Sequence, residues 1–294
     1  NMIAMENAGL HRYTIVLAVC TLFLVVAGAS VTSNDAGLSV PDWPLSYGRL
    51  MPPMTGGIFY EHGHRMVATT VGFLTIVLAV WLWRVERRAW MKWLGLAALG
   101  TVIAQGVLGG LTVLFLLPRP VSIAHACLAQ LFFSTTVAIA MFTSPAWKRG
   151  PQMVDDAGTP PLRMLAMVAP MAVLSQVALG AAYRHKVLGL MPHIVGALVV
   201  AGLVGFASLL VLIQYPSHPA LKKAAHSLLG LTFVQVFLGI AAYMSRITYI
   251  ETARPEPVMV LFTVLHVAAG ALTMAASVAL AIQVLRNVRS IRVQ

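Results

Sequence analysis

The feature that most constrains this chain is a series of eight apolar runs, each long enough to cross a membrane. They lie at 13–32, 66–84, 94–117, 122–144, 163–183, 192–214, 224–245 and 257–285. A helix of about 20 apolar residues spans a hydrocarbon core of roughly 30 Å. In lipid the backbone must satisfy its own hydrogen bonds, which a helix does. The sequence therefore predicts an all-α integral membrane protein with eight transmembrane helices.

Charge distribution agrees with this fold and predicts an orientation. Only 10% of the residues are charged, and these lie between the runs or at their edges, because a charge at the bilayer centre is costly. Thirteen of the twenty Lys and Arg residues lie on the side of the two termini, and seven lie on the other side. The positive-inside rule then predicts that both termini are cytoplasmic. The net charge of +11 indicates this topology and attraction to membrane lipid, with no sign of nucleic-acid binding.

An internal repeat divides the chain into two halves. The segment Gln105–Gly109 recurs as Gln235–Gly239, and His64 at the start of the second run corresponds to His193 at the start of the sixth. Such symmetry between halves is common in membrane proteins. We predict two tandem pseudo-symmetric four-helix bundles, 1–150 and 151–294. The first run has a counterpart in the fifth, so we expect it to be retained rather than cleaved as a signal peptide.

Four histidines stand out among nine. His64, His125, His193 and His266 each lie toward the outer end of an even-numbered run, so each half offers a pair at similar depth. Imidazole is a usual axial ligand of heme iron, and bundles bind cofactors through side chains on facing helices. The pattern predicts two heme sites. His11, His218 and His226 lie at the inner edge, where we expect them to face solvent or headgroups.

Two other readings of these histidines stay open. A neighbouring helix can satisfy a buried histidine without any metal. Zinc also binds imidazole, although a closed zinc site takes four ligands and an open one takes three. The two cysteines, Cys20 and Cys127, lie within apolar runs and imply no disulfide framework.

The most polar stretch at a membrane edge is Glu61-His62-Gly63-His64-Arg65. On a helix, residues three apart share a face, so Glu61 is expected beside His64, where it could orient the ring or move a proton. A planar guanidinium suits a carboxylate, so Arg65 is a candidate partner for a porphyrin propionate. A helix start with an interfacial Arg explains the same spacing.

The outer segment before this stretch, Asn34 to Gly48, followed by Glu61-x-x-His64-Arg65, resembles the signature region of the heme A synthase family. The similarity continues through Gln105–Val113 and His125, and the layout of two halves agrees from end to end. The resemblance implies oxidation of the C8 methyl of heme O to a formyl group, which gives heme A for cytochrome oxidase. It also implies a heme b cofactor and a bacterial inner-membrane location, which the lack of a transit peptide before the first run favours.

Site roles follow from the same resemblance. Glu61 is implied as the catalytic acidic residue, His64 and His125 as the residues flanking the substrate heme, and His193 and His266 as the ligands of heme b. Many family members carry a cysteine pair at the positions of Ser39 and Ser46. This chain lacks it, so its chemistry must proceed without a thiol step there.

Two other functions are compatible with four histidines in a membrane protein. A diheme electron-transfer cytochrome uses the same ligands, but it usually stacks its hemes toward opposite membrane faces. A transporter is disfavoured by the absence of charges within the predicted spans. Expected partners are heme O synthase, cytochrome oxidase assembly proteins, an electron partner of unknown identity and further copies of this chain.

Overall fold

The structure is a computed structural model that describes residues 2–156, 158–252 and 254–290. Its long helices are α1 (Met2–Ser33), α2 (Gly57–Val85), α3 (Ala89–Leu114), α4 (Arg119–Thr143), α6 (Leu162–Arg184), α7 (Leu190–Gln214), α8 (Pro219–Thr248) and α9 (Pro257–Asn287). All eight are long and apolar enough to cross a membrane. The prediction of an all-α, multi-pass membrane protein is confirmed.

Several helices extend beyond the apolar runs into polar residues. Helix α8 begins at Pro219, which needs no helical N–H partner, and the ring of His218 accepts a hydrogen bond from the N–H of Leu221. His218 is only 7% exposed, so the expectation that it faces solvent was wrong. Helix α2 begins at Gly57, well before its apolar run, and thus includes the polar stretch around Glu61.

Helix contacts follow the order of the chain within each half. In the first half α1 packs on α2 and α4, and α3 packs on the same two helices. In the second half α6 packs on α7 and α9, and α8 does likewise. Helices α2 and α4 therefore lie across their bundle from one another, as α7 and α9 do across theirs. The division into two bundles, 1–150 and 151–294, stays a prediction, because α1, α4, α6 and α9 also make contacts between the halves.

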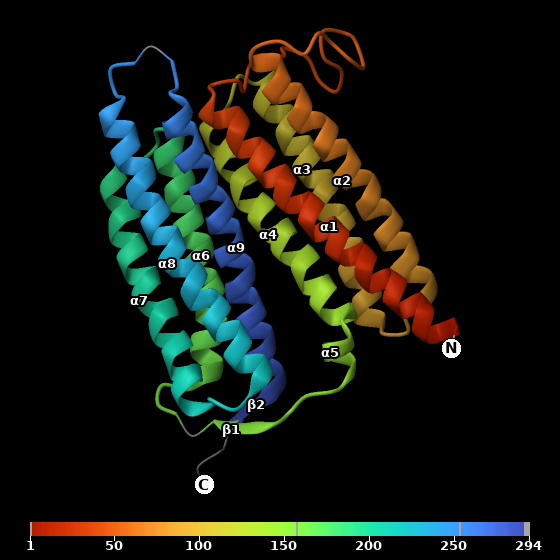
Figure 1. The fold of residues 1–294 in the computed structure, drawn as a ribbon. Coiled ribbons are helices and arrows are strands. Elements are labelled where there is room, and N and C mark those ends of the chain that lie inside the picture. Colours follow the sequence, from red (N-terminus) through yellow and green to blue (C-terminus); the bar gives the residue numbers. More distant parts are fainter. Residues whose placement is uncertain (1, 157, 253, 291–294) are drawn as a thin grey trace.

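A smaller apolar cluster joins the two halves. Val25 of α1 and Phe133 of α4 pack against Ala271 and Ala275 of α9, and α4 also contacts α6. Small residues let helix backbones approach closely in a membrane. Figure 1 shows the halves side by side, with α9 next to α4.

The segment between the halves, predicted as a connector, holds a short helix and a strand. Helix α5 (Pro145–Lys148) is followed by β1 (Val154–Asp156), which pairs in parallel with β2 (Val288–Ser290). Arg163 Nη1 also donates to the carbonyl of Val288 at 2.6 Å. The connector is thus tied to the end of α9.

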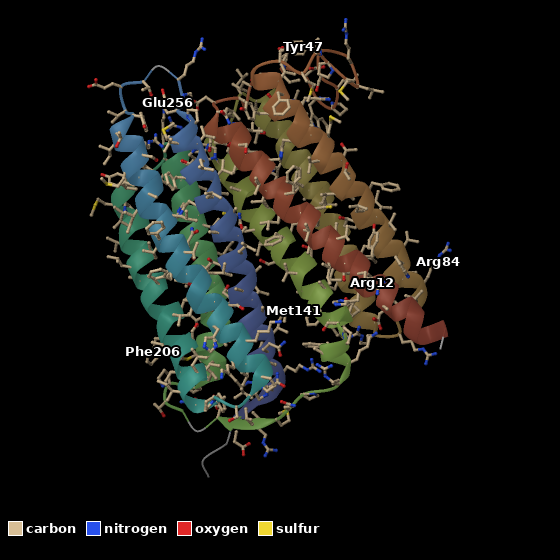
Figure 2. The ribbon with its side chains drawn as sticks, in the orientation of Figure 1. Arg12, Tyr47, Arg84, Met141, Phe206 and Glu256 are labelled. Atoms are coloured by element: carbon tan, nitrogen blue, oxygen red, sulfur yellow. The ribbon has the colours of Figure 1, made fainter. Side chains whose placement is uncertain are left out.

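The start of α1 and the end of α9 lie at one end of the helices, and the long segment 34–56 lies at the other (Figure 1). We call the end that carries 34–56 the outer end, following the predicted topology. Figure 2 shows Tyr47 and Glu256 at this end and Arg12 and Arg84 at the opposite end. This separation is consistent with the basic excess on the side of the termini.

Candidate functional site

The four predicted histidines lie on the helices that face one another across each bundle. His64 is on α2 and His125 on α4, and His193 is on α7 and His266 on α9. Each is near the start of its helix, at the outer end, and each is half-buried. The fold therefore brings together two pairs of imidazoles, as the sequence predicted.

Each imidazole lies against a glycine of the preceding long helix. A Cβ atom added to that glycine would lie close to the Cε1 atom of the ring: 3.0 Å for Gly28 and His64, 3.5 Å for Gly109 and His125, 2.9 Å for Gly180 and His193, and 2.9 Å for Gly239 and His266. The absent side chain gives the ring its place beside the neighbouring backbone. The structure thus contains one Gly–His contact four times, twice in each half.

The second pair has the spacing of two ligands on one metal ion. The ring centroids of His193 and His266 are 6.3 Å apart, and the rings are perpendicular at 90°. A bond of about 2 Å from a ring nitrogen to a metal ion places the centres of two opposed imidazoles roughly 6 Å apart. The residues present therefore fit a heme iron held from both sides.

The first pair offers ring nitrogens without a protein partner. Nδ1 of His64 and Nδ1 of His125 are both buried and accept or donate no hydrogen bond within the described residues. Burial of a polar atom without a hydrogen-bond partner costs free energy. These rings are therefore candidate ligands for a bound group. Among the residues that the structure describes, no cluster of three or more His, Cys, Asp or Glu residues is placed to hold a metal.

Arg65 forms hydrogen bonds that hold the segment 34–56 over the first bundle. Its Nη1 atom donates to the carbonyl oxygens of Asp42 at 2.7 Å and Leu45 at 2.8 Å, and Nη2 donates to that of Val40 at 3.4 Å. A guanidinium suits this role because its donors are fixed in one plane. The pairing of Arg65 with a propionate stays a prediction, and it would require a carboxylate to displace these backbone oxygens.

Glu61 joins the same network, and its partners differ from those expected. Its Oε1 atom accepts from Arg65 Nη2 at 2.7 Å, and its Oε2 atom accepts from the backbone N–H of Val40 at 2.9 Å. The carboxylate is only 5% exposed. The sequence placed it beside His64, but the observed bonds join the carboxylate to Arg65 and to the backbone of the outer segment.

Further hydrogen bonds order the outer segment around Ser39 and Ser46. The Oγ atom of Ser46 bonds Nδ1 of His62 at 2.8 Å, and the hydroxyl of Tyr47 donates to the carbonyl of Ser39 at 2.7 Å. Backbone N–H groups of Gly48 and Tyr47 hold the pKa of the Asp42 carboxyl below its usual value. The segment is therefore ordered by polar contacts, without a disulfide.

Replacing Arg65 with Gln is expected to loosen this segment. Each hydrogen bond to a charged group contributes about 1.5–3 kcal/mol, so losing several should raise amide exchange in residues 40–46 roughly tenfold or more. Hydrogen–deuterium exchange with mass spectrometry measures this. Arg84→Gln, at the other end of α2 and exposed, is the control and should leave exchange unchanged. Equal protection in Arg65→Gln and the native chain would contradict this role.

Sequence reasoning missed the glutamines beside these histidines. Nε2 of Gln176 lies 2.8 Å from the carbonyl oxygen and 2.9 Å from Nδ1 of His193. The repeat of Gln105 and Gln235 was visible, but Gln176 was not connected with it. A Gln four residues before a Gly, present in three of the long helices, was the signal that could have found it.

Comparison with known proteins identifies a family over almost the whole chain. The family model described as cytochrome oxidase assembly protein, COX15-CtaA, matches residues 11–57 and 56–293. The segment with Glu61 and all four histidines of the site lie within the matched residues.

Individual relatives match shorter parts of the chain. A protein of Bacillus licheniformis named heme A synthase is 27% identical over 142 residues, which cover 48% of this chain and 47% of the relative. Another of that name from Symbiobacterium thermophilum is 32% identical over 170 residues, or 56% and 55% of the two chains. A third, from Shouchella clausii, is 30% identical over 139 residues and 45% of each chain. The matched parts thus span about half the length of these relatives.

Proposed function

Because the chain belongs to the cytochrome oxidase assembly protein family, we propose that it is a heme A synthase, an oxidoreductase that converts heme O to heme A. The reaction oxidises the C8 methyl of heme O to a formyl group through successive hydroxylations and loss of water. The observation that carries the proposal is the pair of imidazole sites, one of which lies beneath an ordered outer segment that contacts a buried carboxylate. The name shared by the three relatives supports the same reaction.

The two halves take different roles in this proposal. Residues 1–150 bind heme O between His64 and His125, and residues 151–294 bind heme b through His193 and His266. The difference in their outer connections supports this division. Residues 34–56 form a long segment over the first bundle, whereas α6 and α7 are joined by the short connection 185–189. A covered site excludes water from a reactive substrate, and the first half has the larger cover.

Protein groups supply placement and proton handling for the reaction. The glycines Gly28 and Gly109 give the rings of His64 and His125 their places beside the neighbouring helices, and these rings and the covering segment hold the substrate. Glu61 accepts the proton released near the methyl group, because a buried carboxylate within reach of substrate can act as a base. Heme b, when bound, supplies electron transfer between the substrate site and an outside partner.

The site orientation and partners are part of the proposal. We place the protein in a bacterial inner membrane with both termini cytoplasmic and both heme sites toward the outer face, as the basic excess around the inner connections favours. Conversion of the methyl to a formyl group is a four-electron oxidation of the substrate, so the reaction requires an oxidant and an electron partner outside the site. Heme O synthase as donor of substrate, assembly proteins of cytochrome oxidase as recipients of product, and a homo-oligomer are the other expected partners.

Expression in a host that makes heme O but no heme A tests the function. The hemes are extracted from the purified chain and separated by chromatography with mass detection. Heme A, or heme O with a hydroxylated methyl, is the expected product. Heme b alone in a folded chain supplied with heme O would favour a diheme electron-transfer cytochrome.

A further inference from the structure

Three glutamines occupy the same place relative to the histidines. Gln105, Gln176 and Gln235 each lie four residues before the glycine that faces a histidine, on α3, α6 and α8. Their amide nitrogens lie 3.0 Å from the carbonyl oxygen of His125, 2.9 Å from Nδ1 of His193 and 3.4 Å from Nε2 of His266, respectively. The corresponding position on α1, four residues before Gly28, is Leu24. His64 alone therefore lacks an amide neighbour of this kind.

In the second half, glycines on the helices that carry the histidines leave space for the glutamine side chains. A Cβ added to Gly196 of α7 would lie 2.3 Å from Oε1 of Gln176, and one added to Gly270 of α9 would lie 3.1 Å from Nε2 of Gln235. The histidine helix thus leaves room for the glutamine, and the glutamine helix leaves room for the histidine. The equivalent positions on α2 and α4 carry Val67 and Ala129, so the first half lacks these glycines.

The hydrogen bonds of the rings differ between the halves in the same way. Nδ1 of His193 contacts the Gln176 amide, and Nδ1 of His266 lies 3.2 Å from the backbone oxygen of Gln235. Nδ1 of His64 and Nδ1 of His125 have no partner within the described residues. Among the four rings, only His193 has a glutamine side chain at Nδ1. His266 has a backbone oxygen there, and the Gln235 amide lies near Nε2 of His266 instead.

We infer that Gln176 is a positioning residue that orients the His193 imidazole, so that the second pair retains its heme longer than the first pair, and that Leu24, at the same place on α1, leaves His64 without such an amide. A ring whose Nδ1 is engaged presents only Nε2 to a metal. Hydrogen bonds to the far nitrogen orient a ligating imidazole and strengthen its bond to the metal. An imidazole without them is held by packing alone, forms a weaker bond to the metal and releases its ligand sooner.

The Gln176 amide can form a hydrogen bond with Nδ1 of His193 whether or not Nδ1 carries a hydrogen. When Nε2 of His193 binds a metal, Nδ1 carries the hydrogen and needs an acceptor. Oε1 of Gln176 is buried without a partner among the described residues. Rotation of the amide brings this oxygen toward Nδ1, and the bond from Nε2 to the His193 carbonyl oxygen is exchanged for the new one. A glutamine serves here because one side chain carries both a donor and an acceptor.

This inference rests on the proposed function for the roles of the two sites, but its test needs no turnover. The full chain is loaded with ferric heme b, and the loss of heme to an excess of apomyoglobin is followed by absorbance. His64→Ala with His125→Ala leaves only the second site, and His193→Ala with His266→Ala leaves only the first. The expected result is slow loss from the second site and loss at least tenfold faster from the first. Similar rates from the two sites would overturn the inference.

Two substitutions test Gln176 in the variant that keeps only the second site, His64→Ala with His125→Ala. Gln176→Leu should speed heme loss roughly 10- to 100-fold, the usual effect of removing a partner of a metal ligand. Gln176→Glu keeps an acceptor for Nδ1–H and should retain slow loss. The midpoint potential of the bound heme should also move to a more positive value in Gln176→Leu, because the ligand becomes a weaker donor. Unchanged loss and unchanged potential in Gln176→Leu would exclude a positioning role.

The reverse change tests the first site without disturbing the second. Leu24→Gln is made in the variant that keeps only the first site, His193→Ala with His266→Ala. It supplies the missing amide and should slow heme loss. Leu24→Met, of similar size and apolar, is the matched control. Equal rates in Leu24→Gln and Leu24→Met would refute the assignment of Leu24. If no heme A forms in the functional test but these rates differ as expected, the proposed reaction fails and the inference about the two sites stands.

Discussion

Replacing His266 with Ala is expected to leave a folded membrane protein that carries less than about one tenth of its heme b, since each bis-imidazole site depends on both ligands. The ring of His266 lies against Gly239 and 6.3 Å from the ring of His193, so its loss removes one side of the second site. The pyridine hemochrome of the purified chain measures the heme content.

A histidine away from the site gives the control for this prediction. His226 is exposed on α8 and bonds the carbonyl of Lys222 in its own helix. His226→Ala should keep the full heme b content. Equal heme b in His266→Ala and His226→Ala would mean that the second pair does not bind this cofactor.

Replacing Glu61 with Gln is expected to lower formation of heme A by roughly 10²- to 10⁴-fold, the usual contribution of a general acid or base. The amide has the same shape and still offers an oxygen to the N–H of Val40, so heme content and the outer segment should change little. Extracted hemes, together with hydrogen–deuterium exchange of residues 40–46, report the two properties separately.

Arg65→Gln is the matched variant, because it removes the same ion pair but keeps the carboxylate. It should loosen the outer segment while lowering product formation less than Glu61→Gln does. Heme A formed by Glu61→Gln at the native rate would remove Glu61 from the reaction. A loss of product that is equal in both variants would assign the effect to the covering segment instead.

The fold was predictable because lipid imposes a simple rule on sequence. Eight apolar runs had to become eight helices, and they did. The ends of the helices were less predictable, since polar residues continue a helix beyond the hydrocarbon core. The stretch around Glu61 lies within α2, and only its contacts with the outer segment explain why it is helical and buried.

The candidate site was predictable in its residues and less so in its contacts. Duplication of His64 and His125 as His193 and His266 identified the pairs without any structure. The partners of Arg65 are backbone oxygens 20 to 25 residues away in the chain, and no side-chain pattern marks them. The contact expected between Glu61 and His64 was replaced by an ion pair with Arg65 one residue further along the helix.

Gln176 was missed for a related reason. The connection between α6 and α7 is short, and that between α1 and α2 is long, so a single repeat offset does not align all four helix pairs. Alignment on the glycine that faces each histidine brings the glutamines into register. A repeat of two helices, present four times, describes the site better than a repeat of four helices present twice.

The most direct test of the account compares hemes extracted from three forms of the chain made in a host that supplies heme O but no heme A. The native chain should yield heme A together with heme b, His125→Ala should yield heme b without heme A, and His193→Ala should lose heme b. Heme A in His125→Ala at the native level, or no oxidised heme O in the native chain, would contradict the proposal that the first pair of histidines is the site of heme O oxidation.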